Sequence, residues 1–458
     1  MAKSTIMGEE KIGSLLWKFS LPAIVGMLIN ALYNVIDRIF VGQGVGAIAI
    51  AATTVAFPIM IILMGVSILI GVGATALISI RMGQQNMEEA EKVAGNGATM
   101  LVILPLILTI IYMLFSEQIL IIFGASREVL PYARDFTHII MLGSAIFSIS
   151  MGMNNFIRAE GNPRVAMLTQ IIGGLINIVL NYFFIFIIGM GIKGSALATI
   201  SGQFVSALWV MYYYASGRSL IKIRLKNLIP QKTLIISIIS IGFAPFAMQI
   251  ANSIQNLILN KTLMAYGGDI ALSAVGIMMS IATLIFMPIL GISQGAQPLI
   301  GYNYGARQYD RVKETVRKAV FAGTCIALVL YLAIHTWPYQ IVGLFSKDTG
   351  LTQMTAPAML VFFALLPVIA FQIICSQYFQ SVGKPVQSTI LSLSRQVLLF
   401  IPLLLILPRF WGIDGVWRTA PIADGLSVLL TAGIIYIEMK NLPKSLPLSN
   451  PAGSTGNV

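Results

Sequence analysis

Charged residues are scarce in this sequence. Only 10% of its 458 residues are Asp, Glu, Lys or Arg, whereas soluble domains contain about 25%. Apolar residues make up 57%, and the mean hydropathy is +0.86. A chain with so few charges has too little polar surface for a soluble fold and too much apolar surface to remain unfolded in water. The composition therefore excludes a soluble enzyme and a disordered chain, and it predicts a protein of the lipid bilayer.

Residues that build covalent or metal frameworks are equally rare. The two cysteines, Cys325 and Cys375, lie in separate apolar runs, a spacing that predicts neither a disulfide nor a zinc site. The two histidines, His138 and His335, provide no evident catalytic triad. No Walker A motif is present, so ATP is not expected to drive this chain. We expect no enzymatic activity and no bound cofactor.

Long apolar runs recur along almost the whole chain. A helix needs about 20 mostly apolar residues to cross a bilayer, and lipid offers no hydrogen-bond partners to any other open backbone. The first run is too long for the core of a signal peptide, so we expect it to remain in the membrane. The sequence predicts twelve spans, at residues 15–41, 48–80, 93–115, 131–157, 164–188, 194–214, 234–262, 271–302, 318–338, 354–379, 387–410 and 415–437.

Lys and Arg residues are distributed unevenly between the two sides of this topology. Twelve crossings place both termini on one side, whose loops carry 20 Lys and Arg residues against 8 on the other. Cytoplasmic loops retain positive charge, so both termini are predicted to be cytoplasmic. The net charge of +12 then favours a membrane surface over nucleic acid as a partner, because the basic residues lie in loops and not along one helix face.

The two halves of the chain resemble each other. Gly73 and Gly295 are 222 positions apart (295 − 73 = 222), and the same spacing relates further identical residues. These are Phe123 and Phe345, Gly83 and Gly305, Gly161 and Gly383, and Pro163 and Pro385. Because each half holds six predicted spans, the two copies have the same orientation and their pseudo-twofold axis runs along the membrane normal.

The predicted fold is an all-α polytopic membrane protein with twelve transmembrane helices in two six-helix bundles. The expected domains are a first bundle at residues 1–215 and a second at 234–440. A basic cytoplasmic linker at 216–233 is predicted to lie against anionic headgroups. A Pro-, Ser- and Gly-rich tail at 441–458 is predicted to be disordered.

Acidic residues inside spans are the natural candidates for a functional site, because a charge at the centre of a bilayer costs about 2.5–3.5 kcal/mol on insertion scales. Asp37 lies in the first helix, and Asn30 and Asn34 precede it on the same helix face. Three polar residues along one stripe of an apolar helix predict that this face lines an interior cavity. The alternative is that Asp37 is a solvated residue at the outer end of the helix, beside Arg38.

Two further helices of the first half carry polar groups. Asn177 and Asn181 are one turn apart in the fifth helix, and Thr199 lies in the sixth. Together with Asp37 they offer the carboxylate, amide and hydroxyl oxygens that Na⁺ prefers, or they surround a carboxylate that binds and releases H⁺. The alternative is that these amides and the hydroxyl hold membrane helices together.

The second half has a different set of polar residues. The predicted depths of Arg395 and Asp424 allow an ion pair, which would be structural because it lowers the desolvation cost of both charges; a role in coupling is the alternative. No carboxylate matches Asp37, since the repeat places Asn260 there (37 + 223 = 260). The candidate cavity-lining residues, besides Asn30 and Asn34, are the amides Gln249, Asn256, Gln294 and Gln297.

These motifs resemble those of the multidrug and toxic compound extrusion (MATE) transporters, in particular their bacterial MepA-like branch. The resemblance covers nearly the whole chain. It rests on Ser-Leu-Pro at 20–22 with Asp37, on the Arg-Ala-Glu-Gly-Asn-Pro segment at 158–163, and on Asn177-x-x-x-Asn181. The most specific stretch is Gln-Gly-Ala-Gln-Pro at 294–298, followed by Gly-Tyr-Asn-Tyr-Gly at 301–305.

The resemblance implies a secondary antiporter of the bacterial plasma membrane that exports cationic or amphipathic compounds in exchange for H⁺ or Na⁺ and works as a monomer. In the family, an Asp of helix 1 acts with an Asn and an Asp of helix 5 and a Thr of helix 6, which match Asp37, Asn177, Asn181 and Thr199. Position 181 is Asn here, so either Asp37 alone titrates or the cation site is weaker. The alternative function is that of a flippase for a lipid-linked precursor, from the same superfamily.

Overall fold

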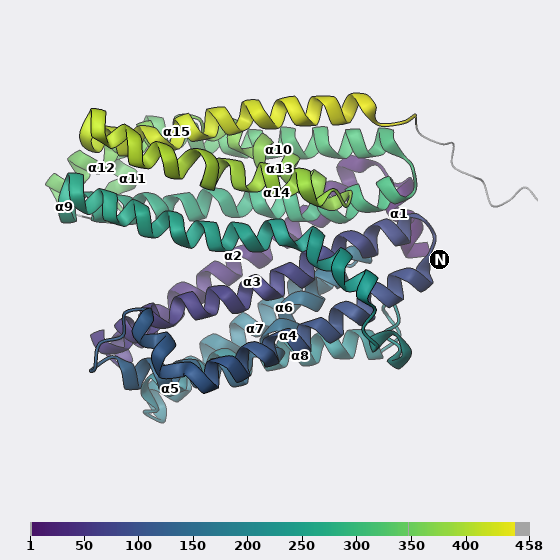
Figure 1. Cartoon of the computed structure of the whole chain (residues 1–458), viewed down its shortest axis with the longest axis horizontal. Coiled ribbons are helices and arrows are strands. Elements are labelled where there is room, and N and C mark those ends of the chain that lie inside the picture. The colour runs from purple at the N-terminus through teal and green to yellow at the C-terminus, as the bar shows by residue number, and fades with distance from the viewer. Residues whose placement is uncertain (1, 347, 445–458) are drawn as a thin grey trace, which may run out of the picture.

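The computed structural model describes residues 2–346 and 348–444, and within these residues it contains helices and no strands (Figure 1). Most of the tail that we predict to be disordered, residues 445–458, lies outside the described residues. The α-helices are α1 (Ala2–Glu9), α2 (Ile12–Gly44), α3 (Ala47–Gly83), α4 (Met87–Ile122), α5 (Leu130–Leu142), α6 (Ser144–Ala159), α7 (Pro163–Tyr182), α8 (Gly191–Ala215), α9 (Lys232–Gly305), α10 (Tyr309–Thr336), α11 (Pro338–Gly343), α12 (Thr349–Phe362), α13 (Leu366–Ser381), α14 (Pro385–Leu393) and α15 (Ile401–Asn441). Short π- or 3₁₀-turns lie at η1 (Phe183–Ile187), η2 (Leu225–Leu228) and η3 (Ser394–Phe400).

Eight described helices are long and apolar enough to cross a bilayer, and the number rises to ten if each of two bent pairs is one span. Two of these ten are too long for one crossing. The 74 residues of α9 would extend about 110 Å at 1.5 Å per residue, against roughly 30 Å of hydrocarbon. Gly268 (φ 62°) interrupts α9, and Gly412 (φ 56°) interrupts α15. Dividing both there gives twelve described segments (10 + 2 = 12), which agrees with the twelve predicted spans.

The backbone repeats itself along the two halves. Gln85 (φ 61°) and Arg307 (φ 58°) are the non-glycine residues with positive φ in the described part of the chain, and they are 222 positions apart (307 − 85 = 222). Gly46, which separates α2 from α3, also has a positive φ and is 222 positions from Gly268. The pair α5 and α6 bends by 54°, and the pair α12 and α13 bends by 52°. Both halves therefore follow the same path.

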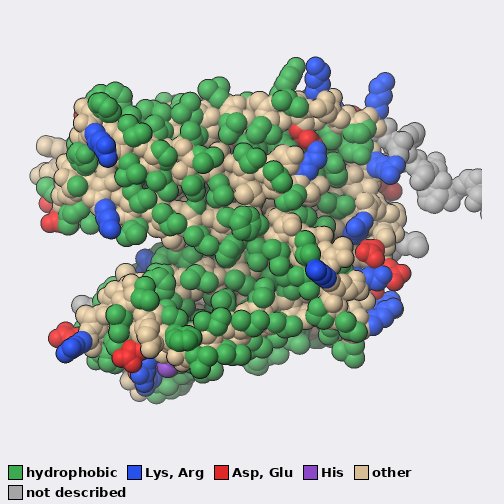
Figure 2. All heavy atoms as spheres, in the orientation of Figure 1, with side chains coloured by type: hydrophobic (Ala, Val, Ile, Leu, Met, Phe, Trp, Pro, Cys, Tyr) green, Lys and Arg blue, Asp and Glu red, His purple; other side chains and the backbone are tan. Residues whose placement is uncertain are grey.

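The two halves form separate bundles that meet at one end and along the adjoining middle of the molecule, and separate towards the other end. In Figure 1, α2–α8 form one bundle and α9–α15 the other. They converge at the end that holds the N-terminus and the segment 216–231, called here the linker end. They diverge at the opposite end, the open end, where Figure 2 shows a hollow between them. Apolar side chains cover the flanks of both bundles between the two ends (Figure 2).

Backbones of the two halves touch at the linker end. A methyl group added to Gly83 would lie 2.0 Å from Tyr302 O, and one added to Gly305 would lie 2.1 Å from Ile80 O. The repeat relates these two contacts, because it matches position 83 with 305 and position 80 with 302. Glycine is required at both positions, since any side chain would push the halves apart.

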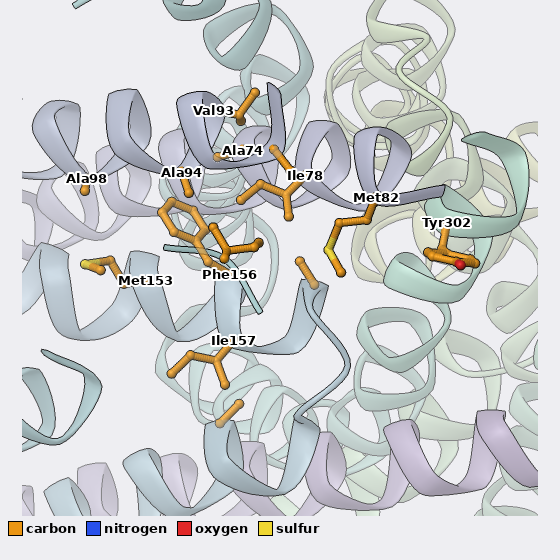
Figure 3. Packing of buried hydrophobic residues seen from close by; sticks show 14 of the residues in the cluster. Ala74, Ile78, Met82, Val93, Ala94, Ala98, Met153, Phe156, Ile157 and Tyr302 are labelled. Carbon is orange, nitrogen blue, oxygen red and sulfur yellow. The ribbon is translucent and has the colours of Figure 1, made fainter. Parts of the chain in front are cut away.

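The apolar core is shared between the halves at the linker end and separate in each half towards the open end. One buried cluster includes Ile78 and Met82 of α3, Phe156 of α6 and Tyr302 of α9, so it joins the halves near the linker end (Figure 3). Towards the open end, each half has a cluster of its own. The shared cluster holds the linker end shut, and the separate clusters leave the open end free to form a hollow.

Several helices extend beyond the predicted spans or are divided within them. The helix predicted at 93–115 is α4, which begins at Met87 because Asn86 Oδ1 accepts a hydrogen bond from Glu89 N at 3.1 Å and caps its polar first turn. The spans predicted at 131–157 and 354–379 are each two helices with a bend between them. Apolar runs mark the part of a helix that crosses lipid and miss the part that extends into water.

Candidate functional site

Asp37 lies where three helices of the first half meet. It is near the C-terminal end of α2, and it faces α7 and α8. Asn181 Nδ2 of α7 donates a hydrogen bond to Asp37 Oδ1, and Ser195 Oγ of α8 donates to the same oxygen at 3.0 Å. Asn181 and Ser195 are fully buried. Two neutral donors therefore hold the carboxylate in a site closed on the side of α7 and α8.

The other two predicted site residues bond to each other next to this group. Asn177 Nδ2 donates to Thr199 Oγ1 at 3.2 Å, and the structure gives neither residue a hydrogen bond to Asp37. Asn177 Oδ1 and Asn181 Oδ1 are buried and have no partner within the described residues. Buried acceptors without a partner are rare, and amide oxygens are groups that hard cations bind. The donor set fits Na⁺ as well as a proton on Asp37.

Close helix packing brings these side chains together. A methyl group added to Gly202 of α8 would lie 2.7 Å from Gly173 O of α7, so the two helices touch through their backbones. Asn177 is one turn along α7 from Gly173, and Thr199 is about one turn before Gly202. Their polar groups therefore meet directly above the contact.

Ser195 is a site residue that the sequence pattern did not predict. It lies one turn before Thr199 in α8, so the two hydroxyls share a helix face in the same i, i+4 spacing that relates Asn177 and Asn181. That spacing was the available signal. The structure shows that Ser195, and not Thr199, is the hydroxyl bonded to Asp37.

The remaining polar stripe of α2 is exposed. Asn34 Nδ2 donates to Asn30 O at 2.7 Å and to Asn30 Oδ1 at 3.1 Å, and both side chains are exposed. They occupy the turns that precede Asp37. Their predicted role in lining the cavity stays a prediction.

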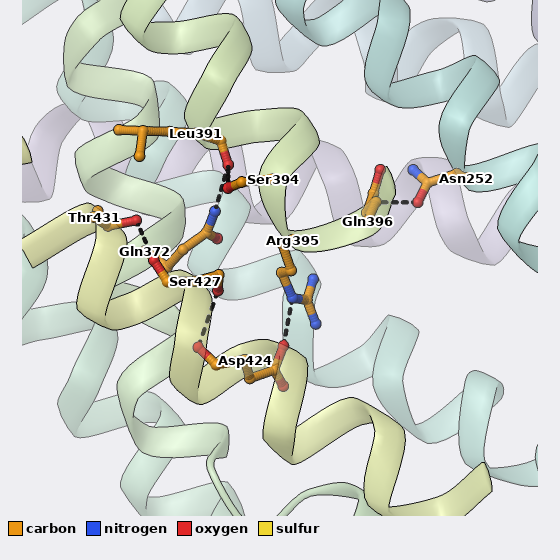
Figure 4. A network of polar contacts seen from close by, with 9 residues as sticks. All are labelled: Asn252, Gln372, Leu391, Ser394, Arg395, Gln396, Asp424, Ser427 and Thr431. Atoms are coloured by element: carbon orange, nitrogen blue, oxygen red, sulfur yellow. Dashed lines mark hydrogen bonds and ion pairs between the residues drawn. The ribbon is translucent and has the colours of Figure 1, made fainter. Parts of the chain in front are cut away.

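The charged pair of the second half is present. Arg395 Nε donates to Asp424 Oδ1 at 2.5 Å (Figure 4). The Asp424 side chain is 3% exposed, whereas the Arg395 side chain is 22% exposed and its guanidinium lies 6.0 Å from the Phe286 ring. Arg395 is in the π-turn η3, and its neighbour Gln396 donates to Asn252 Oδ1. The two charges are thus paired inside the second bundle.

The amides of the second half occupy different places. Gln294 Oε1 accepts a hydrogen bond from Arg158 of α6, so it joins the two halves. Gln297 is buried one turn further along α9, and its Nε2 has no partner in the described part of the chain. Gln249 is half-buried and Asn256 is exposed, and the structure records no side-chain hydrogen bond for either. Gln294 contributes to the contact between the halves.

Comparison with known proteins gives consistent matches along the chain. The MatE family model matches residues 22–183 and 245–406, two stretches displaced by 223 positions (245 − 22 = 223). The multidrug export protein MepA of Staphylococcus aureus (strain N315) is 27% identical over 419 residues, 92% of each chain. MepA of Staphylococcus haemolyticus is 26% identical over 428 residues, 93% of this chain and 94% of its own.

Solved structures share the fold. One is the outward-facing conformation of a multidrug resistance MATE family transporter, with a TM-score of 0.91, 24% identity, and coverage of 96% of this chain and 98% of that one. A transporter of the MOP superfamily from Pyrococcus furiosus, described by a binding pocket of reverse polarity, gives the same TM-score and identity, with coverage of 97% and 99%. Since the family model covers most of the chain, in two copies that coincide with the structural repeat, this multi-pass membrane protein belongs to the MATE family of transporters.

Proposed function

We propose that the protein is a secondary multidrug antiporter of the bacterial plasma membrane, which exports cationic or amphipathic compounds in exchange for H⁺ or Na⁺. The observation that carries the proposal is Asp37, a carboxylate of a membrane helix that accepts hydrogen bonds from Asn181 and Ser195. The relatives named as multidrug export proteins support the substrate class. The charge asymmetry supports a cytoplasmic linker end, and with it an open end that faces outwards.

The proposed mechanism is competition for one negative charge. Ionised Asp37 attracts a cationic drug, and the attraction is strong because the surroundings have a low dielectric constant. A proton on Asp37 removes this charge. A Na⁺ ion held by Asp37, the free amide oxygens of Asn177 and Asn181, and Thr199 would have the same effect. Either ion, arriving from outside, weakens the attraction for the drug and favours its release.

Movement of the two bundles then gives the site access to each side of the membrane in turn. Rocking of one bundle against the other exposes the site to each side in turn, as expected for parallel repeats that share an interface. An ion that moves inwards supplies about 2.3 kcal/mol per 100 mV of membrane potential and about 1.4 kcal/mol per tenfold concentration gradient. Drug and ion need only bind the site alternately for this energy to drive export.

Efflux of a fluorescent cationic dye from proteoliposomes tests the proposal, with either a pH gradient or a Na⁺ gradient imposed. One gradient should drive export by the unaltered protein. Asp37→Asn keeps the volume of the side chain and removes its charge, so it should abolish gradient-driven efflux at normal folded yield. Asp269→Asn is the matched control, because Asp269 is an exposed carboxylate at the open end of the second half. Efflux by Asp37→Asn at the rate of the unaltered protein would place coupling elsewhere.

A further inference from the structure

The N-terminal helix α1 is bound to the second half, although it leads directly into the first helix of the first half. Arg311 Nη2 of α10 donates to two backbone carbonyls, Met7 O at 3.1 Å and Glu10 O at 2.7 Å. Asn303 Nδ2 of α9 also donates to Met7 O, at 3.2 Å. Arg311 Nε donates to Asn303 Oδ1 at 2.9 Å, so the two side chains that hold the segment also hold each other.

The same segment covers the junction between the halves. The Met7 side chain is 1% exposed and belongs to the apolar cluster shared by both halves, together with Met82 of α3 and Tyr302 of α9. Met82 and Tyr302 lie at the same end of that cluster (Figure 3). A methyl group added to Gly8 would lie 3.3 Å from the Tyr302 ring. The end of α1 therefore covers the linker end, next to the contact between Gly83 and Tyr302.

The repeat provides a counterpart to α1 in which the side chains accept hydrogen bonds from the backbone instead of donating them. The linker precedes α9 as α1 precedes α2, and it docks on the first half. Glu160 accepts hydrogen bonds from Leu220 N at 2.8 Å and Ile221 N at 3.2 Å, and Glu91 accepts from Lys222 N at 3.3 Å. Carboxylates thus hold N–H groups of the linker, whereas a guanidinium holds C=O groups of α1. Both are bonds between an ionisable side chain and a backbone, and such bonds to ionised groups are among the stronger hydrogen bonds in proteins.

The two segments differ in what they connect. The linker is covalently continuous with α8 of the first half and docks on that half as far as Gln231, whose N–H donates to Asn96 Oδ1 at 2.6 Å. Its contacts away from α9 can persist when the halves separate, because both partners belong to the first half or follow it directly. By contrast, α1 precedes the first half and docks on the second. When the linker end opens, the bonds from Arg311 to Met7 and Glu10 must break, or α1 must stay with the second half while α2 deforms.

We propose that residues 7–10, held by Arg311 and Asn303, form a strap that keeps the linker end closed and sets the balance between the two open states of the transporter. A strap that binds one state only shifts the equilibrium towards that state by its differential binding energy. The strap is separate from the ion site around Asp37, because its residues lie at the opposite end of the bundles.

Distance measurements between the halves test the strap without any drug or coupling ion. Leu225 of the linker is 84% exposed, and Val386 of α14 is 65% exposed, so cysteines there report on the linker end. Spin labels at both positions, in a Cys325→Ser and Cys375→Ser background, give the distance distribution in lipid nanodiscs. Arg311→Gln should raise the population with the linker end open at least tenfold.

Lys313→Gln is the matched control, because it removes the same charge from the same helix at a residue with no hydrogen bond to the part of α1 whose side chains the structure describes. Arg311→Lys keeps the charge but loses the planar fork, and it should give an intermediate population. Equal distance distributions for Arg311→Gln and Lys313→Gln would overturn the proposal.

A reversible lock covers the case in which Arg311→Gln folds poorly. A methyl group added to Gly8 would lie 3.8 Å from Gln308 Oε1, so Gly8→Cys and Gln308→Cys can be joined by a short bis-methanethiosulfonate. In the Cys325→Ser and Cys375→Ser background, without the reporter cysteines, the joined protein should stop dye efflux, and reduction should restore it. Efflux at the unjoined rate while the link is intact would overturn the proposal.

Discussion

Ser195 gives a sharp test of how the first-half site holds its charge. Ser195 Oγ donates to Asp37 Oδ1 at 3.0 Å from a fully buried position. A hydrogen bond to a charged group contributes about 1.5–3 kcal/mol, and one pH unit corresponds to about 1.4 kcal/mol. Ser195→Ala removes the donor and adds no volume, so the ionised carboxylate loses this stabilisation. The midpoint of the transport–pH profile should move about one to two units to higher pH.

The assay is dye efflux from proteoliposomes in Na⁺-free buffer, measured between pH 5 and 9. Ser206→Ala is the matched control, because Ser206 is a buried serine of the same helix whose Oγ donates to Thr169 O at 3.1 Å and not to Asp37. It should leave the midpoint in place even if it lowers stability. An unchanged midpoint in Ser195→Ala, or an equal shift in Ser206→Ala, would refute the reasoning.

Three further predictions concern stability and topology. Arg395→Leu should lower the unfolding temperature in detergent more than Asp424→Leu, because it leaves unpaired a carboxylate that is 3% exposed, whereas Asp424→Leu leaves unpaired a guanidinium that is 22% exposed. Breaking a buried pair costs about 3–5 kcal/mol, and the double variant should recover most of this loss. An equal effect from Arg418→Leu, at an exposed residue of α15, would argue against the pair. Burial raises the pKa of Glu160 from 4.5 to about 7, so the stability that its protonation gives the folded state is fully present below pH 4.5 and is lost as the pH rises through 7. Glu160→Gln should flatten the fall in unfolding temperature between pH 5 and 8, and an unaltered slope would contradict this. Leu225→Cys should react with an impermeant maleimide in inside-out vesicles and not in intact cells, where labelling would reverse the predicted orientation.

Much of the fold follows from the sequence, because a bilayer permits few structures. Apolar runs and the prohibition of unpaired backbone in lipid predict helices, and the 222-residue repeat predicts two matched bundles. The bends between α5 and α6 and between α12 and α13 were not predicted, since Gly143 resembles any other glycine in an apolar run. Packing against neighbouring helices decides where such a run bends, and that information is not local in the sequence.

The candidate site likewise contains residues that the sequence predicts and residues that it does not. Asp37 and Asn181 were predictable, because a carboxylate and an amide are rare in apolar helices and must find partners there. Ser195 was not predicted, because serine is tolerated throughout membrane helices and gives no signal by type; its one-turn spacing from Thr199 was the signal that remained. The strap could not be predicted from the sequence, since its acceptors are the backbone carbonyls of Met7 and Glu10, and every residue has a backbone carbonyl. Side-chain patterns reveal donors such as Arg311 and say nothing about which backbone they meet.

The backbone contacts between the halves follow the repeat, whereas the polar residues towards the open end do not. The contacts of Gly83 with Tyr302 and of Gly305 with Ile80 are related by the repeat, and a side chain at either glycine would disturb both bundles at once. At the open end each half packs around its own core, so a substitution in one half does not disturb the packing of the other. Polar groups have accordingly diverged there. The first half holds Asp37 among neutral donors, and its counterpart Asn260 is an exposed amide. Packing at the shared interface fixes the path of the backbone in both halves, while the separate cores allow the proposed ion site to lie in the first half alone.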